Sequence, residues 1–161
     1  MTVLDAAAAG AAGGTALNVV TYLDMAIRGR PASQTAEETV RRLADRSHVD
    51  LGPDEQAANR RSGLGPLLGN VAAIGTAVIF GAAARNRRIP IPAAAPLLGA
   101  GAMVAANAPL TALRVTDPRT WSRTDWVADI VPHIVYGVVT AAVWHRLASA
   151  HRRGRTRFRR T

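Results

Sequence analysis

The sequence predicts an all-α integral membrane protein with four transmembrane helices and a short amphipathic surface helix in the first loop. Residues 64–84 and 89–113 are uncharged and apolar, and both stretches exceed the roughly 18 residues that indicate a spanning helix. A third observation is the pair Trp126 and Trp144, which are about 27 Å apart in a helix. This separation is close to a hydrocarbon thickness of about 30 Å and is typical of aromatic residues at the two interfaces.

Composition narrows the classes of function. The chain has 161 residues, no Cys, and a net charge of +9. Disulfides and thiolate chemistry are therefore excluded. All Lys and Arg positions are Arg, and they occupy loops and a tail beside apolar stretches. In a membrane protein this arrangement is first an indication of which side of the membrane each loop faces, and only second an indication of nucleic-acid binding.

We expect the first span at about residues 6–27. The Ala-rich segment follows Asp5 without a basic residue, unlike a cleavable signal peptide, and a soluble Ala-rich helix remains the alternative. Gly10, Gly13 and Gly14 favour close packing against a neighbouring helix. Near its end, Asp24 and Arg28 have the i, i+4 spacing of an ion pair.

The surface helix is expected over residues 36–46. Thr35 and Glu38 have the spacing of a capping box, and Val40 and Leu43 give the helix an apolar edge. Pro53 marks another helix start, which leaves open a continuous helix into the second span.

The second span is predicted at residues 64–84, where small residues recur at every fourth position. This spacing favours close helix packing and involves Gly65, Gly69, Ala73, Ala77 and Gly81. The third span is predicted at 96–113, because Pro90, Pro92 and Pro96 disfavour a regular helix before residue 96. Asn107 is expected to satisfy backbone groups that Pro109 frees.

The fourth span is predicted at residues 125–147, capped by Ser122 or Thr124. The spans form one membrane domain, residues 1–149, followed by a basic cytoplasmic tail, residues 150–161. The Arg-rich turn at residues 85–88 and this tail place both termini in the cytoplasm of a cell-membrane protein.

A polar stripe marks the fourth span. Asp125, Asp129, His133, Tyr136 and Thr140 fall within about 80 degrees of a helical wheel, so they must face protein or water.

Three interpretations of the stripe remain open. In the first, which we favour, Asp125 and Asp129 pair with loop arginines such as Arg114, Arg119 or Arg123, and His133 bonds a neighbouring backbone or Asn. In the second, Asp129 and His133 relay protons or ions. In the third, Asp129 and His133 bind a metal ion, but two ligands without further ones are a weak indication of a metal site.

Asn18, Asn70 and Asn107 complete the candidate polar intramembrane site, since amides hydrogen-bond between membrane helices. No catalytic signature, metal site or cofactor motif is recognisable. The tail is predicted to contact anionic lipid headgroups in preference to nucleic acid. Its lipid-facing residues are Arg152, Arg153, Arg155, Arg157, Arg159 and Arg160.

Three segments carry a resemblance to known proteins: GRPAS after the first helix, NRRSGLGPLLGN before the second, and TDPRTWSRTDWVADIVPHIVYG before the fourth. With these segments the chain resembles a group of small uncharacterised multi-pass integral membrane proteins common in actinobacteria. The resemblance covers most of the chain and supports the membrane assignment, but it implies no reaction.

The sequence therefore predicts a non-enzymatic membrane protein with a structural or accessory role, which forms a homo-oligomer or joins a larger membrane complex. The alternative is a proton- or ion-coupled transporter or channel that uses Asp129 and His133. A membrane-embedded enzyme acting on a lipid or isoprenoid substrate is the third possibility.

Overall fold

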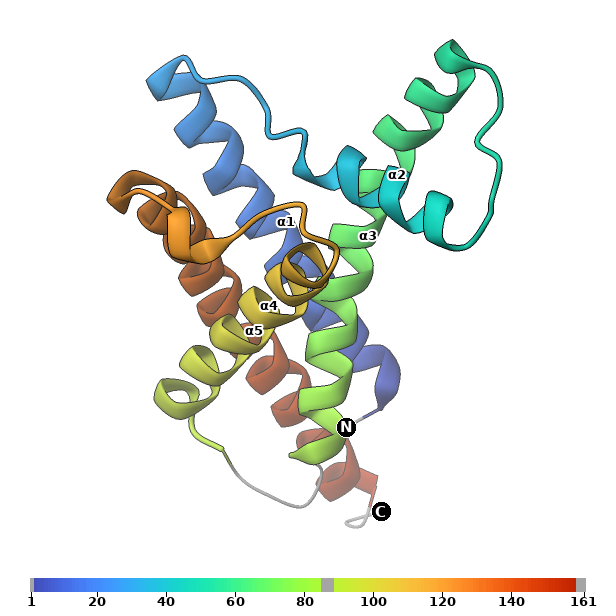
Figure 1. Cartoon of the computed structure of the whole chain (residues 1–161). Coiled ribbons are helices and arrows are strands. Elements are labelled where there is room, and N and C mark those ends of the chain that lie inside the picture. The colour runs from blue at the N-terminus through green and yellow to red at the C-terminus, as the bar shows by residue number, and fades with distance from the viewer. Residues whose placement is uncertain (1, 85–88, 159–161) are drawn as a thin grey trace.

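The structure is a computed structural model that describes residues 2–84 and 89–158, and within these ranges all regular structure is helical. Its elements are α1 (Val3–Arg28), α2 (Thr35–Arg46), α3 (Asp54–Ala83), α4 (Ile91–Ala112), the 3-10 helix η1 (Pro118–Thr120) and α5 (Arg123–Phe158) (Figure 1). The helices α1, α3, α4 and α5 are long and apolar enough to cross a membrane. The predicted all-α architecture is thus confirmed, together with four helices of spanning length.

Local sequence determines where α1 begins and how it ends. The Thr2 hydroxyl accepts a hydrogen bond from the Asp5 N–H, and the Asp5 carboxylate accepts one from the Thr2 N–H, which is a capping box. At the other end Asp24 forms the predicted ion pair with Arg28 (3.4 Å) and a closer one with Arg30 (2.6 Å).

The surface helix α2 is confirmed, but its predicted capping box is wrong. Gln34 is the N-cap residue and its side chain makes no capping hydrogen bond, while the Thr35 N–H donates to the Ser33 hydroxyl (3.3 Å). Glu38 accepts hydrogen bonds from Arg41 and Arg42 at 2.6–2.7 Å. Two guanidinium groups hold this carboxylate more strongly than a backbone N–H, and they lower the pKa of Glu38 to about 2.

Two contacts fix α2 to the long helices. Arg42 donates a hydrogen bond to the carbonyl of Leu113, the residue that ends α4 (2.7 Å). Gly65 of α3 lies so close to Ala36 of α2 that a Cβ at Gly65 would be 3.0 Å from the Ala36 Cβ. The surface helix therefore bridges the start of α3 and the end of α4.

The start of α4 corrects a prediction. The helix begins at Ile91, although Pro92 and Pro96 were expected to prevent helix before residue 96. Pro92 lies in the first turn, where backbone N–H groups have no helical partner, so its missing donor costs nothing. Pro96 lies inside the helix and is exposed, and its fixed φ is compatible with helix despite the lost hydrogen bond.

The helices α3 and α5 extend well beyond the predicted spans. Helix α3 begins at Asp54, so the helix that was expected to start at Pro53 continues without a break into the apolar stretch. Helix α5 begins after Ser122 and continues to Phe158. The Ser122 hydroxyl accepts a hydrogen bond from the Asp125 N–H, and the Asp125 carboxylate accepts one from the Ser122 N–H. Asp125 is thus the acid of a capping box, and the backbone of the predicted tail is helical through residue 158.

Small residues fill most of the interior of the bundle, with Leu98 and Tyr136 as large exceptions, and most large aliphatic residues lie outside. The most buried apolar positions are mainly alanines, among them Ala9, Ala94 and Ala141, which are fully covered. By contrast Val71 and Ile79 of α3 are about 70% exposed (68% and 72%). This distribution is the reverse of that in a soluble domain and is typical of helices that pack closely in lipid.

Glycines form the closest helix contacts. A Cβ at Gly137 of α5 would be 2.8 Å from the backbone nitrogen of Gly99 and would overlap the carbonyl of Ala95 in α4. Gly10 and Gly14 of α1 lie against Ala77 and Ala73 of α3, as their sequence predicted. The predicted groove of α3 is confirmed only in part, because a Cβ at Gly69 would meet no atom within 4 Å.

The two tryptophans of α5 differ from the prediction of a matched interfacial pair. Trp126 is 38% exposed and packs edge-on against Trp121. Trp144 is buried and packs edge-on against Phe80 of α3 with ring centroids 5.3 Å apart. Only Trp126 has the exposure that an interfacial aromatic residue requires.

Candidate functional site

The polar stripe of α5 faces the interior of the protein from His133 onward. His133 is 8% exposed, Tyr136 is fully buried and Thr140 is 1% exposed. Ile134 and Val138 on the opposite face are about half exposed. The predicted orientation of the stripe is therefore confirmed.

Asn107, Asp129 and His133 form a polar cluster between α4 and α5. The Asn107 amide Nδ2 donates to the Asp129 carboxylate Oδ2 (2.8 Å), which links the two helices. His133 Nδ1 lies 2.7 Å from the Asp129 backbone carbonyl and 3.6 Å from its carboxylate Oδ1. The preferred role of Asn107, satisfying backbone near Pro109, is corrected: its side chain binds Asp129 because the crossing of α4 and α5 brings this carboxylate within reach.

The backbone contact of His133 selects its tautomer. A carbonyl oxygen only accepts hydrogen bonds, so Nδ1 must carry the proton. In the neutral ring Nε2 is then a hydrogen-bond acceptor. No hydrogen bond to another described residue engages Nε2.

Asp125 and Asp129 do not have the arginine partners that the favoured interpretation expected. Asp125 is engaged by Ser122, and Arg119 pairs with Asp117 at 3.0 Å. The expectation for His133, a bond to neighbouring backbone, is confirmed. Asp125 and Arg119 have local partners at the helix start and in the loop turn, since residues two or three apart can pair without any tertiary contact.

Tyr136 lies apart from this cluster and connects α5 to α3. Its hydroxyl donates to the carbonyl of Ala73 at 2.6 Å in a fully buried position. Gly13 of α1 allows this approach, because a Cβ there would be 2.9 Å from the Tyr136 ring. The side chain thus joins three helices, which is a structural role.

Asn18 and Asn70 do not join the polar cluster. Both are exposed on α1 and α3, and neither makes a side-chain hydrogen bond to another described residue. Since Gly10 lies against Ala77 and Gly14 against Ala73, the two helices are antiparallel. The same register places Asn18 within about one residue of the level of Asn70.

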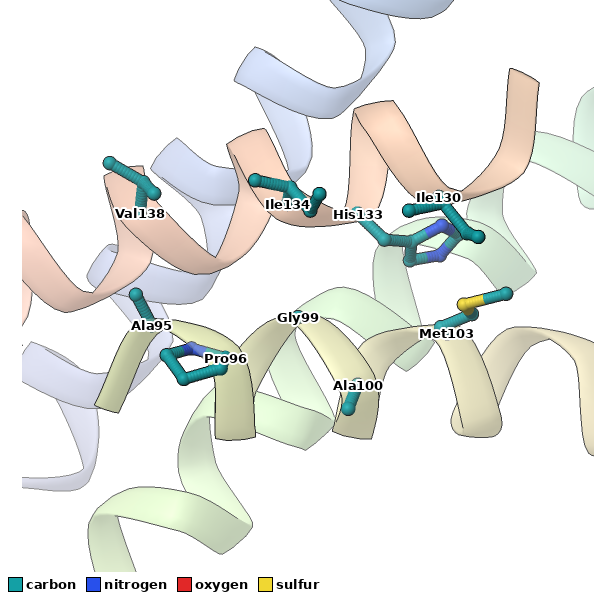
Figure 2. A pocket seen from close by; sticks show the side chains of 9 residues that line it. All are labelled: Ala95, Pro96, Gly99, Ala100, Met103, Ile130, His133, Ile134 and Val138. Carbon is teal, nitrogen blue, oxygen red and sulfur yellow. The ribbon is translucent and has the colours of Figure 1, made fainter. Parts of the chain in front are cut away.

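An apolar groove lies between α4 and α5 beside His133. Its volume is about 330 Å³, and it is lined by residues of α4 between Ala95 and Met103 and of α5 between Ile130 and Val138. Figure 2 shows the His133 ring projecting from α5 toward α4, near Met103 and Ile130. His133 is the sole polar side chain among the described residues of this lining.

The remaining candidate residues add little to the site. Among the described residues, no third His, Cys, Asp or Glu joins Asp129 and His133 as a group that could hold a metal. The tail residues Arg152, Arg153, Arg155 and Arg157 lie on described backbone, but their side chains are outside the described part of the chain, and Arg159 and Arg160 lie wholly outside it.

Two polar contacts were not foreseen from sequence. His145 Nε2 lies 2.8 Å from the carbonyl of Ile89, just before α4, and Arg42 reaches the end of the same helix. The i, i+4 pattern of a single helix carries no signal for either, because each depends on how two helices are placed.

Comparison of the chain with protein-family models, curated proteins and solved structures finds no match. The resemblance to actinobacterial membrane proteins therefore stays a prediction.

Proposed function

We propose that this chain is a four-span integral membrane protein with a non-enzymatic, structural or accessory role, and that it assembles in the bilayer with itself or with a larger membrane complex. The observation that carries the proposal is the outward surface of α3. Only 11% of the residues in its most apolar stretch are buried, and the exposed Asn70 lies within this stretch. An amide that faces hydrocarbon without a partner is costly, so a neighbouring protein is the favourable environment for it.

Two further features support assembly. Asn18 on the adjacent α1 is also exposed and lies near the level of Asn70, so a partner helix at this edge would meet two amides. The polar groups inside the bundle join its own helices: Tyr136 to Ala73 and Asn107 to Asp129. Such bonds are expected of a rigid scaffold.

The experiment is extraction from native membranes in a mild detergent, followed by native mass spectrometry of what co-purifies. We expect a stoichiometric partner or a homo-oligomer, and Asn70→Leu should release it without lowering thermal stability. Ile79→Leu is the matched control, since Ile79 is exposed about 180 degrees away on the same helix. A purely monomeric protein, or complexes that survive both substitutions equally, would contradict the proposal.

A second candidate function is proton- or ion-coupled transport, favoured by the contact of Asn107, Asp129 and His133 across α4 and α5. Intramembrane ionisable residues in contact are typical of proton pathways. Flux into liposomes that requires Asp129 and His133, tested with Asp129→Asn and His133→Ala, would support this function over the accessory role.

We also propose an orientation with both termini in the cytoplasm. In Figure 1 the start of α1 and the end of α5 lie at the same end of the bundle, together with the end of α3 and the start of α4. Ten of the twenty arginines lie at this end, all in or next to a short turn and the tail, whereas most of the other ten lie in the long first connection, which has little influence on orientation. There the tail would contact anionic lipid headgroups.

A further inference from the structure

We propose that the groove between α4 and α5 binds a single-chain lipophilic alcohol, such as a long-chain or prenyl alcohol, whose hydroxyl donates a hydrogen bond to Nε2 of His133. The evidence is one polar atom in an otherwise apolar site. The His133 side chain is 90% buried (10% exposed), and its Nδ1 is held by the Asp129 carbonyl. Its Nε2 has no partner among the described residues, so a ligand hydroxyl would complete its hydrogen bonding.

The size of the groove determines the kind of chain. Its volume of about 330 Å³ is at the lower end of ligand sites, which span roughly 300–1,000 Å³. At about 30 Å³ for a water-sized group, this is room for roughly eleven heavy atoms. The space suits one hydrocarbon chain with a small polar head and is too small for a two-chain phospholipid.

The direction of the groove fits an amphiphile in a bilayer. His133 lies toward the end formed by Met103 and Ile130, and the lining continues as purely apolar surface to Ala95 and Val138 (Figure 2). The polar end is the one nearer Trp126, which is about 10 Å before His133 along α5. A ligand would therefore place its hydroxyl toward the Trp126 side and its chain deeper in the membrane.

The crossing of α4 and α5 makes this site rigid. A Cβ at Gly99 would be 2.8 Å from the His133 carbonyl oxygen, so the backbones of α4 and α5 are in direct contact at the groove. The Asn107 bond to Asp129 fixes the same two helices on the other side of His133. A preformed site of this kind loses little entropy when a ligand binds.

The test uses the full chain in lipid nanodiscs with its methionine methyl groups labelled for NMR. The chain has three methionines, of which Met103 lines the groove and Met25 on α1 does not. We expect titration with dodecanol to shift the Met103 signal in a saturable manner and to leave Met25 unchanged. Dodecyl methyl ether, which lacks the donor, should bind about three- to tenfold more weakly.

Variants separate the hydrogen bond from the cavity. His133→Phe should remove the preference for the alcohol over the ether. Ala100→Phe should prevent binding of both, because Ala100 is exposed and lines the groove. Val104→Phe, exposed on the same helix but outside the lining, should change neither.

Several results would overturn the inference. They are equal affinity for alcohol and ether in the unmodified protein, a Met103 shift that does not saturate, and binding that survives Ala100→Phe. Preferential binding of dodecanoic acid would show that Nε2 donates, which contradicts the assigned acceptor. The comparison of ligands needs no substitution, so it remains decisive if a variant fails to fold.

Discussion

Individual polar side chains of α5 differ in what they do, although the sequence places them on one stripe. Asp125 caps its own helix, Asp129 and His133 face α4, and Tyr136 reaches α3. Helical periodicity is sufficient to predict that these residues share one face that turns toward protein or water. It cannot predict that Tyr136 separates from His133, because that depends on which neighbouring helix lies opposite each turn.

At Tyr136 we expect Tyr136→Phe to lower the free energy of unfolding by about 1 kcal/mol, since it removes a buried hydrogen bond to Ala73 and leaves the ring in place. The measurement is unfolding in mixed detergent micelles. Tyr22→Phe is the matched control, because Tyr22, the chain's other tyrosine, is 60% exposed. Equal stability of the two variants would show that the Tyr136 hydroxyl is not structural.

Pairs of helices are held by small residues, and here the sequence was informative in some places and misleading in others. Gly10 and Gly14 were predicted at a helix contact and lie in one. Gly69 fits the same spacing but faces open space, because an Ala- and Gly-rich chain contains more small-residue repeats than helix contacts. The contact between Gly99 and Gly137 also has small residues four positions apart, but the pair was not singled out from sequence, because only the crossing of α4 and α5 distinguishes it from the other repeats.

Substitution of Gly137 tests this crossing. Gly137→Ala should cost about 1–3 kcal/mol of stability, because the new methyl group would collide with backbone atoms of α4 that cannot move aside easily. Gly69→Ala should instead be neutral or stabilise by up to about 1 kcal/mol through better helix propensity. Thermal unfolding of both variants decides the matter, and an equal effect would contradict the observed packing.

The stability of α2 should depend on pH through Glu38. Its pKa falls from an ordinary 4.5 to about 2 on folding, so its ion pairs with Arg41 and Arg42 contribute fully above about pH 4.5. That contribution is lost as the pH falls toward 2. We expect hydrogen exchange in α2, referred to the intrinsic rate at each pH, to lose protection over this range.

Two variants are needed to assign the pH effect. Glu38→Gln should show reduced protection already at neutral pH, whereas Glu37→Gln should behave like the unmodified chain, since Glu37 forms no ion pair with any residue in the described part of the chain. If protection in α2 is unchanged between pH 5 and 2, the ion pairs with Glu38 do not hold the helix.

On the scale of the whole molecule, the distribution of residue sizes is the strongest argument for a bilayer environment. Large aliphatic side chains such as Leu67, Val71 and Leu97 are more than half exposed, while alanines and glycines fill most of the interior. The apolar stretches, together with the helix cap at Ser122 and the spacing of the two tryptophans for the fourth span, were sufficient to predict four long helices. The start of α4 was misplaced because Pro92 falls in a first turn, where its missing N–H has no helical partner to lose, and Pro96 costs one hydrogen bond on an exposed face of the helix.

Single cysteines can test the proposed insertion and orientation, because the chain has none of its own. In intact cells we expect a membrane-impermeant maleimide to label Ser47→Cys, because Ser47 is exposed after α2, at the end of the bundle that the proposed orientation places outside. Ala150→Cys, exposed near the end of α5, should react only after permeabilisation, and Val71→Cys in the apolar stretch of α3 should remain unlabelled in both conditions. Labelling of Ala150→Cys in intact cells, or activity outside the cytoplasm of a reporter fused after Thr161, would reverse the orientation. Rapid labelling of Val71→Cys by the same reagent would argue against membrane insertion of α3.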